Sequence, residues 1–313
     1  MSHIIDDKSP ICIPFILERL HGHQADNSGK PFIIGLNGVQ GVGKTTLVKA
    51  LSSTLRDREG LQTLVVSIDD FYLKHEDQVA LAESHPDNVL VSCRGEPGIC
   101  SHMAIPMHAC RRPSNEDTGT HDMVLASQFF SAIAEGKPAK IPQYDKSAFS
   151  GQGDRGPESS WESINQPGQP KVQVVIFEGW CVGFRPLSPK EVETKWQAPS
   201  RTLNLHKLEH LLFVNERLQG YESITKLFDA FIHIDAEDTQ YVYDWRREQE
   251  VKLREEKGTG MTDDQVIKFV DAYYPAYELF SDKLRQGVLP GKSGCQLRLV
   301  VGKDRKVKQK IVI

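Results

Sequence analysis

The feature that most constrains the fold is a short glycine-rich segment near the N-terminus. Residues 38–45 read Gly-Val-Gln-Gly-Val-Gly-Lys-Thr and match the pattern G-x-x-x-x-G-K-[ST] at every required position. The apolar run at residues 32–36 is typical of a buried strand, and residues 45–58 carry apolar side chains at helical spacing. In this strand–loop–helix setting, the pattern predicts a phosphate-binding loop (P-loop) and not a chance glycine turn.

The residue types of this loop suit a nucleoside triphosphate. Glycines let consecutive backbone N–H groups turn toward an anion, and the N-terminal end of the following helix adds positive charge. In such loops the lysine, here Lys44, reaches the β- and γ-phosphates, and the hydroxyl of Thr45 binds Mg²⁺. We therefore expect ATP and Mg²⁺ as cofactors. The expected nucleotide-binding residues are Gly38, Val39, Gln40, Gly41, Val42, Gly43, Lys44, Thr45 and Thr46.

Further apolar runs predict more buried strands. Residues 64–68, 172–177 and 231–234 are rich in β-branched or aromatic side chains, and each run is followed directly by an acidic residue. Strands that alternate with helices favour an α/β fold of the P-loop NTPase type, with a doubly wound, mostly parallel sheet flanked by helices. Ligands of such sheets bind at the carboxyl ends of the strands, where these acids lie.

The C-terminal part reads as helices followed by a strand pair. Residues 240–256 form a charged amphipathic pattern, and residues 262–284 predict one or two helices, with Pro275 as a kink or break. Residues 297–313 predict two strands. We expect a single domain over residues 1–313. Its parts are an N-terminal helix and loop at 1–29, an insertion at 99–119, a helical lid region at 240–285 and C-terminal strands at 295–313.

Two segments rich in Gly, Pro, Ser and Asn, at residues 111–120 and 150–170, are expected to be surface loops. The composition argues against several classes of partner. The formal net charge is −4, which lacks the basic footprint of a nucleic-acid binder, and the apolar runs are too short to cross a bilayer. The N-terminus lacks a signal or transit pattern, so we expect a cytoplasmic protein, with the nucleus as a second compartment. The oligomeric state is left open.

Strand-end acids are the candidates for phosphoryl-transfer chemistry. The chain contains no Asn-Lys-x-Asp motif, which argues against a GTPase. A kinase needs an acid near the acceptor hydroxyl, and Asp69 supplies one if its strand lies beside the first strand. The alternative is that Asp69 or Asp70 caps the next helix. Glu178 ends a strand that resembles a Walker B strand and can act through Mg²⁺, or it is a solvated carboxylate.

A cation is also needed near the transferred group. Arg246 lies in the charged helical segment, where its guanidinium can stabilise charge on the γ-phosphate in the transition state. Arg246 on a solvated helix face is an equally weighted alternative.

Taken together, these segments resemble the P-loop small-molecule kinases that include uridine kinase, pantothenate kinase and phosphoribulokinase. The closer similarity is to the branch of D-glycerate 3-kinase and its fungal ATP-binding relatives, and it spans nearly the whole chain from about residue 30. The segments that carry it are residues 38–46, 67–73, 119–122, 141–147, 153–155, 177–180, 214–215 and 241–246.

The resemblance implies an ATP-dependent kinase that phosphorylates a hydroxyl of a small organic acid, with D-glycerate first. Two alternatives stay open: another acceptor (a nucleoside, pantothenate or a sugar), or an ATP-binding regulator without transfer activity. The implied catalytic residues are Lys44, Asp69 and Arg246, and the implied metal-binding residues are Thr45, Asp69 and Glu178. The implied substrate residues are Asp70, Tyr72, Arg94, Asp122, Tyr144, Lys146 and Arg155.

Within this set, Asp122 resembles an acid that binds a substrate hydroxyl, and Tyr144 resembles an aromatic residue of the substrate pocket. An acceptor with a carboxylate should meet a cation, and Arg94, Lys146 and Arg155 are unranked candidates for it. The alternative for each is a solvated surface charge.

The chain departs from the family pattern at one place. In the family, Arg-Gly-x-Pro-Gly runs directly into Thr-His-Asp, whereas here residues 99–119 separate Arg94-Gly-Glu-Pro-Gly from Thr120-His-Asp122. We expect this segment to be a flexible insertion, with a gene-model error as the alternative. Its position beside Asp122 favours the regulator alternative, whereas the presence of both Asp69 and Glu178 opposes it.

Overall fold

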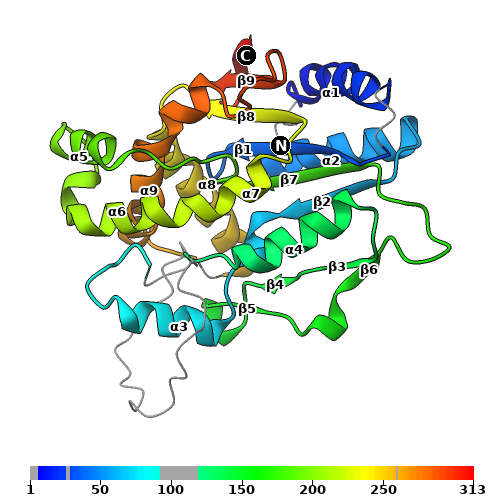
Figure 1. Ribbon diagram of the computed structural model, residues 1–313. Helices are drawn as coiled ribbons and strands as arrows, with labels where there is room; N and C mark the ends of the chain where they lie inside the picture. Colours follow the sequence, from blue (N-terminus) through cyan, green and yellow to red (C-terminus); the bar gives the residue numbers. More distant parts are fainter. Residues whose placement is uncertain (1–5, 26–28, 92–118, 259) are drawn as a thin grey trace.

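A computed structural model describes residues 6–25, 29–91, 119–258 and 260–313. Its centre is a six-stranded sheet in the order β10-β9-β8-β1-β7-β2 (Figure 1). Five strands run parallel, and β10 pairs antiparallel with β9 at one edge. The predicted α/β fold with a mostly parallel sheet is confirmed. The strands are β1 (Phe32–Gly38), β2 (Thr63–Ser67), β7 (Val174–Gly179), β8 (Ala230–Ala236), β9 (Gln296–Val301) and β10 (Val307–Val312).

The order of the strands differs in one respect from the arrangement that the sequence suggested. Strand β2 does not lie beside β1, because β7 is inserted between them and pairs with both. Glu178 therefore lies on a strand next to the P-loop strand, and Asp69 lies one strand further away on the same side of it. In-register parallel pairing still brings the carboxyl ends of all three strands together.

Helices cover both faces of the sheet (Figure 1). Helices α1 (Ser9–Ala25) and α2 (Lys44–Ser53) pack together on one face, and a single π-helical turn at Thr54–Arg58 extends α2. The opposite face carries α4 (Met123–Ala134), α7 (Glu222–Thr225) and α9 (Asp263–Gln286). The remaining helices are α3 (His75–Ser84), α5 (Pro189–Gln197), α6 (Leu208–Arg217) and α8 (Tyr241–Lys257).

Phenylalanine rings fill the core beneath α4. Phe177 of β7 lies 4.8 Å from the ring of Phe130 on α4 and 6.3 Å from that of Phe228, as measured between ring centroids. Phe228 in turn stacks on Phe231 of β8 at 6.0 Å. Gly35 of β1 makes this packing possible, because a Cβ atom there would come within 2.6 Å of the Phe228 ring.

Two local expectations were wrong in part. Of the alternatives for residues 262–284, a single helix is observed and a break at Pro275 is not: α9 runs continuously from Asp263 to Gln286, and a buried face along its length compensates for the hydrogen bond that proline cannot make. The predicted loop at residues 150–170 contains two short strands, β5 (Asp154–Arg155) and β6 (Glu162–Ile164). These strands pair antiparallel with β4 (Tyr144–Asp145) and β3 (Ala139–Ile141), respectively.

The composition of residues 150–170 predicted a loop because composition carries no information about pairing with strands outside the segment, which here are β3 and β4. The other predicted loop, at residues 111–120, lies almost wholly outside the described residues. No helix in the described part of the chain is both long enough and apolar enough to cross a membrane.

Candidate active site

The P-loop connects the end of β1 to the start of α2. Gly43 precedes α2 with φ of 99°, a left-handed conformation that glycine adopts without strain. The ammonium of Lys44 lies inside the loop and donates hydrogen bonds to the backbone oxygens of Gly38 (2.7 Å) and Val39 (3.3 Å). Thr45 and Thr46 are exposed in the first turn of α2. The loop thus has the shape, the lysine and the hydroxyls of a triphosphate cradle.

Residues far away in the sequence hold this loop in place. Gly41 has φ of 79°, and a Cβ there would come 2.6 Å from the Cβ of Trp245 on α8. The backbone oxygen of Gly41 accepts a hydrogen bond from Arg305 (2.7 Å), and the backbone N–H of Gln40 donates to the hydroxyl of Tyr277 (3.2 Å). Sequence reasoning missed all three supporting side chains, because nothing local marks a contact more than 200 residues away.

Two carboxylates lie near the P-loop lysine. Glu178 on β7 is in register with Leu36 of β1 and Ser67 of β2, and Asp69 follows Ser67 by two residues. Burial lowers the pKa of Lys44, and the negative charges of Glu178 and Asp69 act in the opposite direction. Among the described residues, no group of three or more His, Cys, Asp or Glu side chains is arranged to bind a metal ion by itself.

The neighbouring acids Asp69 and Asp70 have different environments. Asp70 caps the short helix at Ile68–Phe71: its carboxylate accepts from the backbone N–H of Ser67 at 3.3 Å. Burial raises the pKa of Asp70 to about 6, against backbone hydrogen bonds that lower it. Asp69 has no part in the cap through its side chain. Its Oδ2 accepts from Lys146 at 2.6 Å, and its Oδ1 is buried with no hydrogen-bond partner among the described residues.

A second pair of predicted residues forms an ion pair nearby. Arg155 lies opposite Tyr144 in the β4–β5 ladder and donates to Asp122 Oδ2 at 3.0 Å. Asp122 also caps α4, since its Oδ1 accepts from the backbone N–H of Leu125 at 2.9 Å. The structure therefore brings Asp122, Tyr144 and Arg155 together, although they are separated by up to 33 positions in the chain.

Aromatic side chains connect the two clusters. Tyr72 stacks on His121 with ring centroids 4.3 Å apart and lies 5.3 Å from Tyr144. The indole N–H of Trp180 donates to the hydroxyl of Tyr72 at 3.4 Å. Burial lowers the pKa of His121 to about 4, so this histidine is neutral near pH 7, and its Nδ1 lies 2.7 Å from the hydroxyl of Tyr221.

His121 was part of the Thr-His-Asp segment in the sequence but had no role assigned to it.

Arg246 lies on α8 next to Trp245, which contacts the P-loop, but its guanidinium pairs with Glu250 at 2.6 Å and packs 4.2 Å above the Phe269 ring. Its role over the γ-phosphate stays a prediction. Arg94 and residues 99–118 lie outside the described residues.

These features define a class of protein. The sheet is mostly parallel, and a glycine-rich loop with an inward lysine follows strand β1. Acids lie at the ends of β7 and β2, the two strands on one side of β1. This arrangement is typical of a P-loop nucleotide-dependent phosphotransferase.

Comparison with known proteins narrows this class. Residues 21–84 match the model of the KAP family P-loop domain. The chain is 37% identical to an uncharacterized kinase, mug58, of Schizosaccharomyces pombe over 85% of its own length and 86% of that protein. It is 34% identical to the chloroplastic D-glycerate 3-kinase of Arabidopsis thaliana over 80% of its length, which is 48% of that enzyme.

A solved structure agrees over nearly the whole chain. The D-glycerate 3-kinase of Cryptococcus neoformans superposes with a TM-score of 0.80 and 31% identity, and covers 98% of this chain and 99% of that one. The chain belongs to the family of ATP-dependent small-molecule kinases in which these proteins are found, and the predicted resemblance is confirmed.

Proposed function

We propose that this protein transfers the γ-phosphoryl group of Mg-ATP to a hydroxyl of D-glycerate. The observation that carries the proposal is the position of Asp69, whose carboxylate lies near the P-loop lysine and has one buried oxygen without a partner among the described residues. Two relatives named D-glycerate 3-kinase support the choice of acceptor.

In this proposal the P-loop binds the nucleotide. Backbone N–H groups of residues 38–43 surround the terminal phosphates, and the Lys44 ammonium exchanges its bonds to the Gly38 and Val39 carbonyls for phosphate oxygens. Mg²⁺ fits the oxygen donors at this place, because the hydroxyl of Thr45 and the carboxylate of Glu178 are the hard ligands that it prefers. When bound, Mg²⁺ neutralises charge on the phosphates.

Asp69 has the role of general base in this proposal. It accepts the proton of the acceptor hydroxyl, which raises the nucleophilicity of the oxygen that attacks the γ-phosphorus. Asp122, held by Arg155 and by the N-terminus of α4, retains lone pairs that can accept a hydrogen bond from a second acceptor hydroxyl. Tyr72 and Trp180 form an aromatic wall that excludes water from the reacting groups.

The proposal also includes the binding partner and the cellular compartment that the sequence suggests. We propose a small molecule as the binding partner, not nucleic acid or a membrane, and the cytoplasm as the compartment, from the sequence alone.

An acceptor panel in an ADP-release assay tests the proposal. D-glycerate, L-glycerate, glycerol, uridine and pantothenate are each supplied with Mg-ATP, next to a reaction without acceptor. We expect ADP release that depends on D-glycerate, and none after Lys44→Met. A strong preference for uridine or pantothenate would overturn the choice of acceptor. ATP binding with no transfer to any acceptor would instead support the regulator alternative.

A further inference from the structure

The strongest unexplained contact at the site is the ion pair between Lys146 and Asp69. The Lys146 ammonium lies 2.6 Å from Asp69 Oδ2, the same carboxylate that the proposed function uses as a base. The ammonium occupies Oδ2 and Oδ1 is buried, so a hydroxyl that is to donate its proton to Asp69 competes with Lys146 for Oδ2. A base that is occupied in this way needs a mechanism that removes the lysine before reaction.

The pair is placed so that it can be exchanged. The Lys146 side chain is 53% exposed and follows the two-residue strand β4, whereas the Asp69 side chain is 23% exposed. An ion pair whose lysine is half exposed to water is weaker than a buried one, and lysine has a long, flexible stem. Another anion that arrives at the site can therefore take the ammonium from Asp69.

The neighbouring cation is not available in this way. The Arg155 side chain is 7% exposed, is anchored in the β4–β5 ladder and is committed to Asp122. If Arg155 moved toward an acceptor, its guanidinium, on a side chain that is 7% exposed, would lose its ionic partner Asp122, and separating such a buried charge from its partner is costly. Of the two described candidates for binding an acceptor carboxylate, only Lys146 lies beside the base and in contact with solvent.

We propose that Lys146 is the residue that selects acceptors with a carboxylate, and that it does so by an exchange of partners. Without acceptor, its ammonium neutralises Asp69. An anionic acceptor binds the ammonium through its carboxylate and thereby releases Asp69 to accept the hydroxyl proton. A neutral polyol binds without releasing Asp69, so the same contact rejects it. This inference rests on the proposed function and specifies the class of acceptor: small hydroxy acids.

The test is Lys146→Met, which keeps the length of the side chain and removes its charge. The two acceptors compared are D-glycerate and glycerol; D-glycerate carries a carboxylate where glycerol carries a hydroxymethyl group. We expect kcat/KM for D-glycerate to fall roughly 10- to 100-fold, mainly through KM, because a charged hydrogen bond is lost. We expect kcat/KM for glycerol to stay the same or to rise, since Asp69 is no longer neutralised. Lys146→Arg should restore part of the preference for the acid.

The control is Lys140→Met on strand β3, where the lysine pairs with Glu158 at 3.5 Å and has no ion pair with a site residue in the part of the chain that the structure describes. It should leave both acceptors unaffected. Equal losses for D-glycerate and glycerol in Lys146→Met, or an unchanged preference for the acid, would overturn this inference alone.

Failure of the proposed function gives a different result. If the parent protein uses pantothenate and not D-glycerate, the choice of D-glycerate is wrong, and the pair pantothenate and pantothenol tests Lys146 in the same way. Use of uridine with no use of either acid would overturn both the proposed function and this inference.

Discussion

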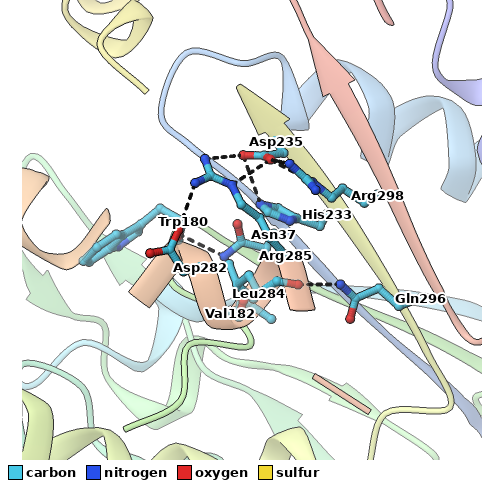
Figure 2. A network of polar contacts seen from close by, with 10 residues as sticks. All are labelled: Asn37, Trp180, Val182, His233, Asp235, Asp282, Leu284, Arg285, Gln296 and Arg298. Atoms are coloured by element: carbon cyan, nitrogen blue, oxygen red, sulfur yellow. Dashed lines mark hydrogen bonds and ion pairs between the residues drawn. The ribbon is translucent and has the colours of Figure 1, made fainter. Parts of the chain in front are cut away.

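Two aspartates at the same edge of the central sheet show how differently a carboxylate can be used. Asp235 at the end of β8 accepts hydrogen bonds from Arg285 (2.9 and 3.0 Å) and Arg298 (2.8 and 2.6 Å), as Figure 2 shows. Its side chain is 4% exposed. Asp69 beyond β2 contacts a single half-exposed lysine, Lys146, and keeps one oxygen without a partner among the described residues.

The environment of Asp235 is that of a structural anchor. Burial opposes its ionisation, but hydrogen bonds from Arg285 and the charges of His233 and Arg298 outweigh burial and lower its pKa. Arg285 lies on α9, Asp235 on β8 and Arg298 on β9, so the cluster fastens the helix to both strands (Figure 2). Arg285 also pairs with Asp282 within α9. Both carboxylate oxygens of Asp235 accept hydrogen bonds from anchored arginines, which is the environment of a structural residue.

The comparison shows that a strand-end position alone does not make an acid functional. Asp235 is the penultimate residue of the apolar strand β8, and Asp69 follows the apolar strand β2. Both therefore lie at the carboxyl ends of parallel strands, where ligands of such sheets bind. The difference is the number and mobility of their cations: two anchored guanidiniums at Asp235, and one exchangeable ammonium at Asp69. Variants at the two positions should therefore have opposite effects on activity and on stability.

The largest effect is expected from Asp69→Asn. The amide cannot accept the hydroxyl proton, so kcat should fall roughly 10²- to 10⁴-fold, the usual contribution of a general base. ATP affinity should change little, because the P-loop is untouched, and the urea midpoint should also stay close to that of the parent. Turnover in the ADP-release assay, nucleotide titration and urea unfolding measure the three quantities. Undiminished turnover would remove Asp69 from the role of base.

Asp235→Ala should have the reverse profile, with its main effect on stability. Removal of the carboxylate leaves Arg285 and Arg298 close together without their shared partner, and we expect the free energy of unfolding to fall by about 3 kcal/mol. Urea denaturation measures this as a lower midpoint at an unchanged slope.

The matched control for Asp235→Ala is Glu256→Ala. Glu256 forms an exposed i,i+4 pair with Lys252 at 3.7 Å on α8, and its loss should change stability by less than about 0.5 kcal/mol. Equal effects of the two variants would contradict the assignment of Asp235 as an anchor.

The sequence was sufficient for the elements that local patterns determine. The P-loop, its flanking strand and helix, and the strands that end near Asp69, Glu178 and Asp235 were predictable because apolar runs and glycines report burial and turns directly. The α/β class followed from their alternation. The continuity of α9 through Pro275 was not predictable, since it depends on packing along the whole helix and not on the residues next to the proline.

The site was only partly predictable for a related reason. Residue types and a family resemblance brought Asp69, Asp122, Lys146 and Arg155 into one set, but not their pairing. That Arg155 binds Asp122 while Lys146 binds Asp69 depends on the β4–β5 ladder, whose second strand lies in the segment 150–170 that composition had suggested was a loop. Long-range backbone pairing decides which cation remains exchangeable, and no local pattern encodes it.

The smallest of the expected effects concerns His233, the histidine beside the Asp235 anchor. Its Nε2 lies 3.8 Å from Asp235 Oδ1, and its Nδ1 is buried without a hydrogen-bond partner among the described residues. Burial lowers the pKa of His233 to about 4; the charge of Asp235 opposes this shift, and those of Arg285 and Arg298 add to it. The ordinary pKa of histidine in an unfolded chain is about 6.5.

The sign of the pH effect follows from these two pKa values. Between pH 6.5 and 4 the unfolded chain binds a proton at His233 that the folded protein does not bind, so stability from this group is complete above pH 6.5 and is lost as the pH falls toward 4. From pH 7 to 5 the loss should be about 2 kcal/mol. His233→Gln cannot be protonated and should lose that much less stability than the parent over the same interval.

Urea unfolding of the parent and of His233→Gln at pH 7 and pH 5 gives the loss in free energy of unfolding for each protein, and the two losses are then compared. Contributions from other titrating groups, including the buried His121, are present in both proteins and cancel. The same loss in parent and variant would mean that His233 is protonated in the folded anchor as readily as in the unfolded chain. The Asp235 cluster would then accept a positive charge beyond its two arginines, and the contrast between the two aspartates would weaken.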